Sequence, residues 1–185
     1  MDHYLEIRLL PDPEFSPGLL MNALFAKLHR ALVDLDSKTI GASFPDIGKQ
    51  TLGQRLRLHS TADELTRLMT LNWLTGMGDH VTVKEPGPIP EAVSYRVVRR
   101  MQAKSNPERL RRRQIKRKRL DQEQARQAIP DAVAERLDLP FVTVKSRSNG
   151  QRFRLFIDQG PARAEPVNGL FSHYGLSATA TVPWF

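Results

Sequence analysis

Two different hydrophobic periods alternate along the first hundred residues, and this alternation limits the folds that the chain can adopt. Apolar side chains occupy every second position of residues 5–9, which is typical of a half-buried strand. Leucines recur at every fourth position of residues 20–32, after a Ser16-Pro17 pair that favours a helix start. A strand followed by an amphipathic helix is therefore expected.

The same signals continue and predict the element order β-α-β-β-α-β. A second helix is expected to begin at Ser60 or Thr61 and to end near Trp73. The further strands of this order are expected at residues 40–44, 52–58 and 81–83, and an additional strand at residues 95–98 follows the loop at residues 86–90. This order is that of the ferredoxin-like sandwich, which has many functions but is common among RNA-binding proteins. We therefore expect an α+β protein in which residues 1–93 form a ferredoxin-like, RRM-like domain.

The remainder of the chain is expected to form a linker and a second domain. We assign residues 94–104 to the linker and residues 105–185 to a C-terminal α+β domain, because the charge density changes here. Asn149-Gly150, between two apolar runs, is the strongest hairpin signal in the chain. The hairpin strands are expected at residues 141–144 and 153–157, with residues 169–176 and 181–185 completing the sheet.

Positive charge is concentrated between residues 96 and 119. The chain has 28 Lys and Arg against 20 Asp and Glu, a net charge of +8, and Glu108 is the one acidic residue in this stretch. Such a balance indicates a polyanionic partner or an acidic surface. The sequence Ser-Asn-Pro-Glu at residues 105–108 is a capping box that predicts a helix extending to about residue 120. Asp121 is expected to cap a further helical stretch that ends near residue 130, and residues 131–137 are expected to form a last short helix.

The spacing of the cations in this helix favours phosphate binding over a merely solvated surface. Like charges at positions i and i+4 repel each other, so a helix that gathers them on one face is stabilised by a bound anion. We expect an affinity for nucleic acid that falls steeply with salt. The shared face consists of Arg109, Arg112, Arg113, Lys116 and Arg117.

Arg100 and Gln102 precede this helix and are candidates for reading bases. Arginine pairs bidentately with guanine and glutamine with adenine, whereas phosphate contacts position a nucleic acid without specifying its sequence. From the residues alone, two ordinary linker side chains are the stronger interpretation.

Several classes of protein and site are disfavoured by what the sequence lacks. Without cysteine there is neither a disulfide framework nor a thiolate zinc site. The histidines have no recognisable metal-ligand spacing, no glycine-rich phosphate loop is present, and no apolar stretch approaches the roughly 20 residues of a membrane helix. Because the charged beginning is unlike a secretory signal, we expect a cytoplasmic protein with no cofactor, no metal and no membrane partner.

Metal-free acid–base catalysis by a histidine is compatible with the sequence. Imidazole titrates near neutrality, so a histidine can remove the proton of an RNA 2′-hydroxyl. His29 lies four residues after Phe25, at the edge of the leucine stripe. Taken alone, His29 is more often a partly buried packing residue than a catalyst, and His173 and Tyr174 are equally ambiguous.

Four segments of the sequence resemble one enzyme family, and the likeness covers essentially the whole chain. They are QAKSNPERLRRR at 102–113, KSRSNGQRFRLF at 145–156, YGLS at 174–177 and VPWF at 182–185, and the opening MDHYL matches too. The chain resembles the CRISPR repeat-processing endoribonuclease of type I-F systems, and the first of these segments is long enough to be very specific. The resemblance implies a ferredoxin-like N-terminal domain and a C-terminal domain that presents an arginine-rich helix.

The resemblance also implies catalytic roles for individual residues. His29 corresponds to the histidine that assists attack of a 2′-hydroxyl on the adjacent phosphate. Ser146 corresponds to the serine that holds this hydroxyl, and Tyr174 to the tyrosine that orients the histidine. The implied reaction cleaves pre-crRNA at the base of the repeat hairpin without a metal ion, and it leaves a 5′-hydroxyl and a 2′,3′-cyclic phosphate.

Further positions correspond to RNA-binding residues of the family. Phe153 matches the aromatic residue that stacks on the nucleotide before the cut, and Arg100 and Gln102 match the residues that read the lowest base pairs. Other contacts to the RNA are implied for Arg109, Arg112, Arg113, Lys116, Arg117, Ser148 and Asn149. Asn149 stands where family members carry threonine, a departure that concerns one phosphate contact. The protein is expected to stay on its crRNA, together with the other subunits of a type I-F interference complex.

Two other classes of protein share the basic composition. A non-catalytic RNA-binding module would have the same fold and the same cationic helix without turnover. A basic ribosomal or DNA-coating protein would bind duplex DNA and hairpin RNA with comparable affinity at matched salt.

Overall fold

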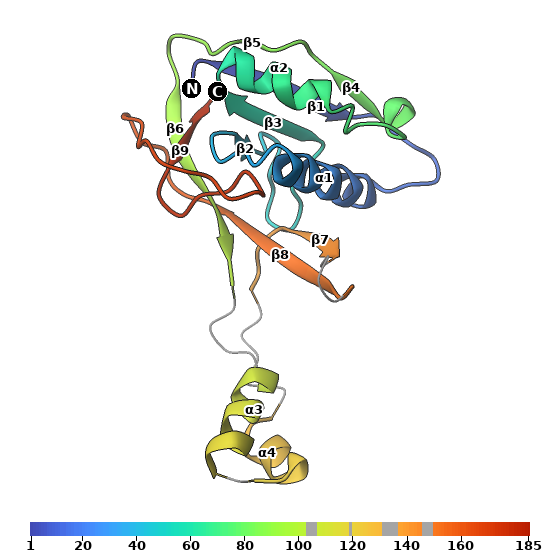
Figure 1. Ribbon diagram of the computed structural model, residues 1–185, viewed down its shortest axis with the longest axis vertical. Coiled ribbons are helices and arrows are strands. Elements are labelled where there is room, and N and C mark those ends of the chain that lie inside the picture. The colour runs from blue at the N-terminus through green and yellow to red at the C-terminus, as the bar shows by residue number, and fades with distance from the viewer. Residues whose placement is uncertain (103–106, 119, 131–136, 146–149) are drawn as a thin grey trace. The chain divides into compact units, whose positions relative to one another are not determined.

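The structure, a computed structural model, describes residues 1–185 except 103–106, 119, 131–136 and 146–149 (Figure 1). Contacts within the chain divide it into two compact units. The first unit comprises residues 1–100 together with residues 139–185, and the second comprises residues 101–138. Among the described residues, none of the helices combines the length and the apolar character that crossing a lipid bilayer requires.

The first unit begins with the predicted β-α-β-β-α-β order. Its elements are β1 His3–Leu9, α1 Pro17–Asp34, β2 Gly41–Ser43, β3 Arg55–Ser60, α2 Ala62–Thr70 and β4 Val81–Val83, with a 3₁₀ turn at Gly78–His80 and a short strand β5 at Gly87–Pro88. The strands form an antiparallel sheet in the order β2-β3-β1-β4, and β5 pairs with β1. The order of the strands confirms the predicted ferredoxin-like arrangement.

Both helices begin where a side chain satisfies a free backbone amide. The Ser16 hydroxyl accepts from the backbone N–H of Leu19, and the Thr61 hydroxyl accepts from that of Glu64, so Thr61 rather than Ser60 caps the second helix. The predicted leucine stripe of α1 is buried at all four positions, between 0 and 5% exposed: Leu20, Leu24, Leu28 and Leu32. Because this stripe packs into the core, only the side chains on the other sides of α1 remain accessible to solvent.

A second antiparallel sheet combines segments that are far apart in the sequence. It consists of β6 Ser94–Met101, β7 Phe141–Lys145, β8 Arg152–Gln159 and β9 Thr181–Trp184, in the order β7-β8-β6-β9. The strand expected at residues 95–98 is confirmed as part of β6, which pairs with β9. Most of the expected linker, residues 94–104, therefore belongs to this sheet. The expected strand at residues 169–176 is wrong. Gly175 has a φ of 69°, and Ser172 N–H donates to the Leu176 carbonyl, which closes a turn there.

The two sheets of the first unit share one core. The β7–β8 hairpin contributes Val142, Val144, Leu155 and Ile157 to the same buried cluster as α1 and the first sheet. Contacts therefore join residues 139–185 to the N-terminal hundred, whereas the expected boundaries at residues 93 and 105 followed the change in charge. The distribution of charged residues describes the surface of a protein and does not show where its hydrophobic core ends.

The second unit is a pair of helices. They are α3 Pro107–Lys118 and α4 Gln122–Ala128, which contact each other. Asp121 caps α4 in a capping box with Gln124, as predicted for this aspartate. The capping box predicted at residues 105–108 and the short helix predicted near residues 131–137 lie largely outside the described residues. Ala125 and Ile129 are buried in this unit.

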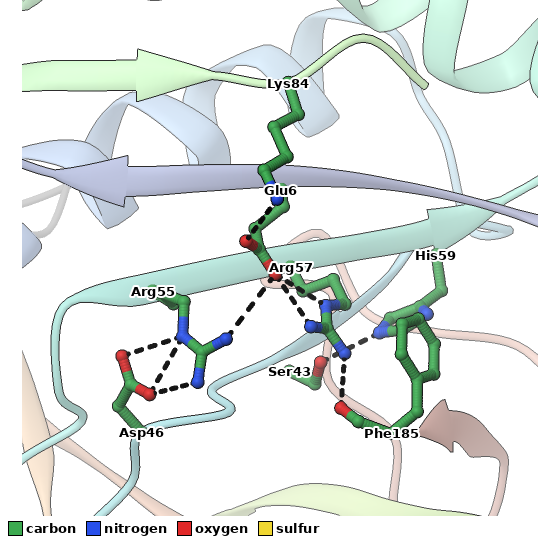
Figure 2. A network of polar contacts seen from close by, with 8 residues as sticks. All are labelled: Glu6, Ser43, Asp46, Arg55, Arg57, His59, Lys84 and Phe185. Carbon is green, nitrogen blue, oxygen red and sulfur yellow. Dashed lines mark hydrogen bonds and ion pairs between the residues drawn. The ribbon is translucent and has the colours of Figure 1, made fainter. Parts of the chain in front are cut away.

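A buried ion pair lies on the first sheet (Figure 2). Burial by itself raises the pKa of Glu6, but hydrogen bonds from Arg57 and the charges of Arg57, Lys84 and Arg55 lower it below its usual value. Arg57 Nη1 also donates to the Phe185 carbonyl oxygen at 2.7 Å, and its guanidinium lies 4.0 Å from the centre of the Phe185 ring. These contacts attach the end of β9 to β3 and so hold the two sheets together.

Candidate active site

The five histidines have different environments. These environments show which histidines have a structural role and which are candidates for catalysis. His59 is fully buried on β3 and shares a 2.8 Å hydrogen bond with the Ser43 hydroxyl (Figure 2). Burial, with a smaller contribution from the Arg57 charge, lowers the pKa of His59 to about 3. His3 contacts Asp2, and His80 contacts Asp12. Of the five, His29 is the one whose ring is stacked on a tyrosine.

His29 is positioned by the packing of α1. It follows the buried Leu28 and is itself half-buried, so its ring lies at the edge of the core and not inside it. Its Nδ1 donates to the backbone carbonyl of His173 at 2.8 Å. In the neutral ring this hydrogen bond places the proton on Nδ1 and leaves the lone pair on Nε2. Nε2 has no hydrogen-bond partner among the described residues, so it is the nitrogen that can accept a proton.

Tyr174 lies flat against His29. The two ring centroids are 4.0 Å apart with 12° between their planes, and Phe25 continues the stack at 6.1 Å from Tyr174. The structure therefore brings together two residues that are 145 positions apart in the sequence. The imidazole has one edge on a backbone carbonyl and one face on an aromatic ring, which restricts its rotation.

The turn that carries Tyr174 is held tightly against β2. Ala42 N–H donates to the Gly175 carbonyl at 2.8 Å. A Cβ on Gly175 would lie 2.8 Å from Ala42 Cβ and 3.1 Å from its backbone nitrogen, and the φ of 69° also favours glycine. The His173 ring contacts Asp36 at 3.1 Å, just beyond the end of α1. The position of the turn is thus fixed from both sides.

The β7–β8 hairpin lies beside α1 (Figure 1). The side-chain oxygen of Asn22 on α1 accepts the Thr143 backbone N–H at 2.8 Å, and Lys145 pairs with Arg152 at the end of the described ladder. The chain between this pair carries Ser146, Ser148 and Asn149, and these three predicted site residues lie outside the described residues.

Phe153 and Arg100 lie together in the first unit. The Arg100 guanidinium carbon is 5.5 Å from the centre of the Phe153 ring, within range of a cation–π contact. Phe153 is half-buried against the core, and Arg100 is exposed near the end of β6. An aromatic face beside a guanidinium is suited to stacking with a nucleobase. Gln102 is exposed just after β6 and belongs to the second unit.

The arginines of the basic helix α3 differ in their exposure and contacts. Leu110 and Ile115 are half-buried, and Arg111 donates through Nε and Nη2 to the Ile129 carbonyl at 2.8 and 2.7 Å. Arg111 therefore holds the helix pair together. The exposed cations of α3 are Arg112, Arg113, Lys116, Arg117 and Lys118. Arg109 also belongs to α3.

Sequence reasoning did not identify the contacts around His29. The His173 carbonyl accepts from His29, the Phe25 ring extends the stack beyond Tyr174, and the Asn22 side chain joins α1 to the β7–β8 hairpin. These contacts join segments that are far apart in the chain, and no local spacing indicates them. Asp36, whose φ of 47° is uncommon for a non-glycine residue, contacts the His173 side chain. Among the described residues, no three His, Asp or Glu side chains come together in a way that could hold a metal ion.

Known proteins resemble this chain along its full length. The family model described as "CRISPR-associated protein (Cas_Csy4)" matches residues 4–185. A protein of Pseudomonas aeruginosa (strain UCBPP-PA14) named "CRISPR-associated endonuclease Cas6/Csy4" is 54% identical over 187 residues, which cover both chains completely. A protein of Escherichia coli (strain UTI89 / UPEC) with the same name is 52% identical over 185 residues, again with both chains fully covered. The stacked histidine, the β-α-β-β-α-β sheet and the basic helix pair thus occur in a chain that belongs to the Cas_Csy4 family of CRISPR-associated proteins.

Proposed function

We propose that this protein is an endoribonuclease that binds the stem-loop of CRISPR repeats and cuts pre-crRNA at the base of the hairpin. The observation that carries the proposal is the placement of His29. Its Nδ1 is occupied by the His173 carbonyl, its ring is held on Tyr174, and α1 lies beside the hairpin whose loop carries Ser146. The endonuclease names of both relatives support the same activity.

The proposed chemistry depends on His29 Nε2, the ring nitrogen that can accept a proton. His29 Nε2 takes the proton of the 2′-hydroxyl while that oxygen attacks the adjacent phosphorus. The bond from phosphorus to the 5′ oxygen breaks, and this oxygen takes a proton from water or from the imidazolium just formed. The products are a 2′,3′-cyclic phosphate and a 5′-hydroxyl. Ser146 holds the attacking hydroxyl in line, which converts a slow intramolecular reaction into a fast one. The reaction requires no divalent ion.

We assign RNA binding to four sets of residues. The exposed cations of α3 and Arg109 follow the phosphates, Arg100 and Gln102 read the lowest base pairs, and Phe153 stacks on the nucleotide before the cut. Ser148 and Asn149 add contacts from the hairpin loop. Because many of these contacts involve RNA that stays after cleavage, we expect slow product release and a protein that remains on the crRNA within an interference complex.

The proposal is tested by incubating the full chain with type I-F repeat hairpin RNAs in EDTA and mapping the cut. His29→Ala should slow single-turnover cleavage by at least about 100-fold while leaving the Kd for the hairpin within about twofold. His3→Ala is the matched control and should cleave at the normal rate. A 2′-deoxy sugar at the cut site should abolish cleavage.

The same assay separates the rival classes. A wild-type protein that binds the hairpin without cutting any repeat would be an RNA-binding module. Cleavage of the 2′-deoxy substrate would contradict the proposed nucleophile, and cleavage only after addition of a divalent ion would contradict the metal-independent step. Equal affinities for duplex DNA and hairpin RNA at matched salt would indicate a general nucleic-acid coat.

A further inference from the structure

A cavity of about 440 Å³ lies between the N-terminal half of α1 and the β7–β8 hairpin. Much of its lining is apolar, and two of these side chains are also exposed, Phe15 by 39% and Leu19 by 52%. The Phe15 ring is held edge-on against the His80 ring, 5.7 Å away at 88°, and His80 is hydrogen-bonded to Asp12. The other apolar lining residues are Leu20, Ala23, Ala26 and Met77.

The charged residues that line this cavity are positive. Lys27, Lys145 and Arg152 contribute to it, and its described lining includes no Asp or Glu. Lys27 Nζ donates to the Thr75 carbonyl at 2.6 Å, and none of the three cations forms an ion pair with a described residue. Apolar and aromatic surface beside uncompensated cations is the combination that binds single-stranded nucleic acid, because bases stack and phosphates are neutralised.

The cavity lies on the side of α1 that also carries His29. Asn22 and Ala26 line the cavity. His29 follows Asn22 by seven residues and Ala26 by three, so the three residues lie on one side of the helix. On β8, Arg152 lines the cavity while the neighbouring Phe153 lies under Arg100. Successive residues of a strand point to opposite faces. The hairpin therefore presents an aromatic–guanidinium surface on one face and a cationic cavity on the other.

We propose that this cavity is a second RNA subsite, which binds the first single-stranded nucleotides on the 3′ side of the cut. The base lies against Phe15 and Leu19, and the phosphates lie near Lys145 and Arg152. The inference rests on the proposed function, because it needs the scissile phosphate at His29. With the nucleotide before the cut on Phe153, the strand that leaves after the cut passes to the opposite face of the hairpin.

The test compares uncleavable hairpin RNAs with a 2′-deoxy sugar at the cut site and zero, one or four nucleotides beyond it. Wild-type protein should bind the extended RNAs about tenfold more tightly than the RNA that ends at the cut, the effect of one stacked base. Phe15→Ala and Leu19→Glu should lose this gain and keep wild-type affinity for the RNA without an extension. That retained affinity also shows that both variants are folded.

Leu71→Glu is the matched control, because Leu71 is 41% exposed and does not line the cavity. It should keep the full gain from the extension. The subsite is overturned if the wild-type affinity does not depend on the extension, or if Leu19→Glu binds every RNA as the wild type does, as expected for a cavity that takes a protein partner. Failure of the proposed function gives a different result, because the wild type would then leave uncut the all-ribose RNAs that extend beyond the cut site.

Discussion

The imidazole ring of His29 lies parallel to the phenol ring of Tyr174, with 4.0 Å between the ring centroids and 12° between the planes. The contact is made by ring faces, and the Tyr174 hydroxyl has no hydrogen-bond partner among the described residues. The aromatic face of Tyr174, and not its hydroxyl, therefore holds the histidine.

Two substitutions of Tyr174 should therefore differ in effect. Tyr174→Phe keeps the stacked face and should cleave within about threefold of the wild-type rate. Tyr174→Leu removes it, and the freed imidazole should lower the single-turnover rate by about tenfold or more, since small misplacements of a catalytic group are costly. Single-turnover kinetics with saturating protein measures both, and equal rates for the two variants would contradict a role of the ring face.

Gly175→Ala should impair both the fold and the site. Its Cβ would meet Ala42 at 2.8 Å, and the left-handed backbone penalises any side chain, so we expect a loss of about 1–3 kcal/mol in the free energy of unfolding. The turn must shift to relieve the contact, and the His173 carbonyl and the Tyr174 ring shift with it. Cleavage should fall more than hairpin binding. Gly76→Ala is the control, because Gly76 also has a positive φ but a Cβ there meets nothing within 4 Å. Equal loss of cleavage in both variants would assign the effect to backbone strain alone.

Two arginines of α3 should respond differently to substitution. Arg113 is exposed, so Arg113→Gln should weaken RNA binding and reduce the slope of log Kd against log salt by about one, with no loss of stability. Arg111 donates two hydrogen bonds to the Ile129 carbonyl, so Arg111→Gln should destabilise the helix pair. Binding at several salt concentrations, together with circular dichroism, separates the two. An unchanged salt slope for Arg113→Gln would remove this residue from the phosphate-binding face.

His59 should make the stability of the fold depend on pH. Burial lowers the pKa of His59 to about 3, so the unfolded chain binds more protons than the folded chain between pH 3 and the ordinary histidine pKa of 6.5. Folding stability should therefore fall as the pH decreases from 7 to 5, by about 2 kcal/mol from this residue. His59→Gln can keep the hydrogen bond to Ser43 and does not titrate. Urea unfolding at both pH values should show a smaller difference for this variant, and an unchanged difference would assign the effect to other groups.

Local patterns predicted the elements well where one side of an element is buried. The leucine stripe of α1, the Ser16 cap and the Asp121 cap were predicted from nearest neighbours, and each depends on contacts within one or two turns. The two wrong assignments concern segments whose structure depends on remote partners. The expected linker at residues 94–104 is mostly the strand β6, which the pairing with β9 makes part of a sheet, and the expected strand at residues 169–176 is a turn held against β2.

The sequence by itself determined the β-α-β-β-α-β order of the first hundred residues, the basic face of α3 and the family resemblance, because hydrophobic period, charge and motif are properties of neighbouring residues. Only the tertiary structure decided how His29 is held, since the His173 carbonyl and the Tyr174 ring reach His29 from 144 and 145 residues away. It also decided that the hairpin shares the core of α1 and forms a cationic cavity beside it. The physical reason is that burial and tertiary hydrogen bonds form between segments that are distant in the sequence, and local sequence patterns do not show which distant segments come into contact.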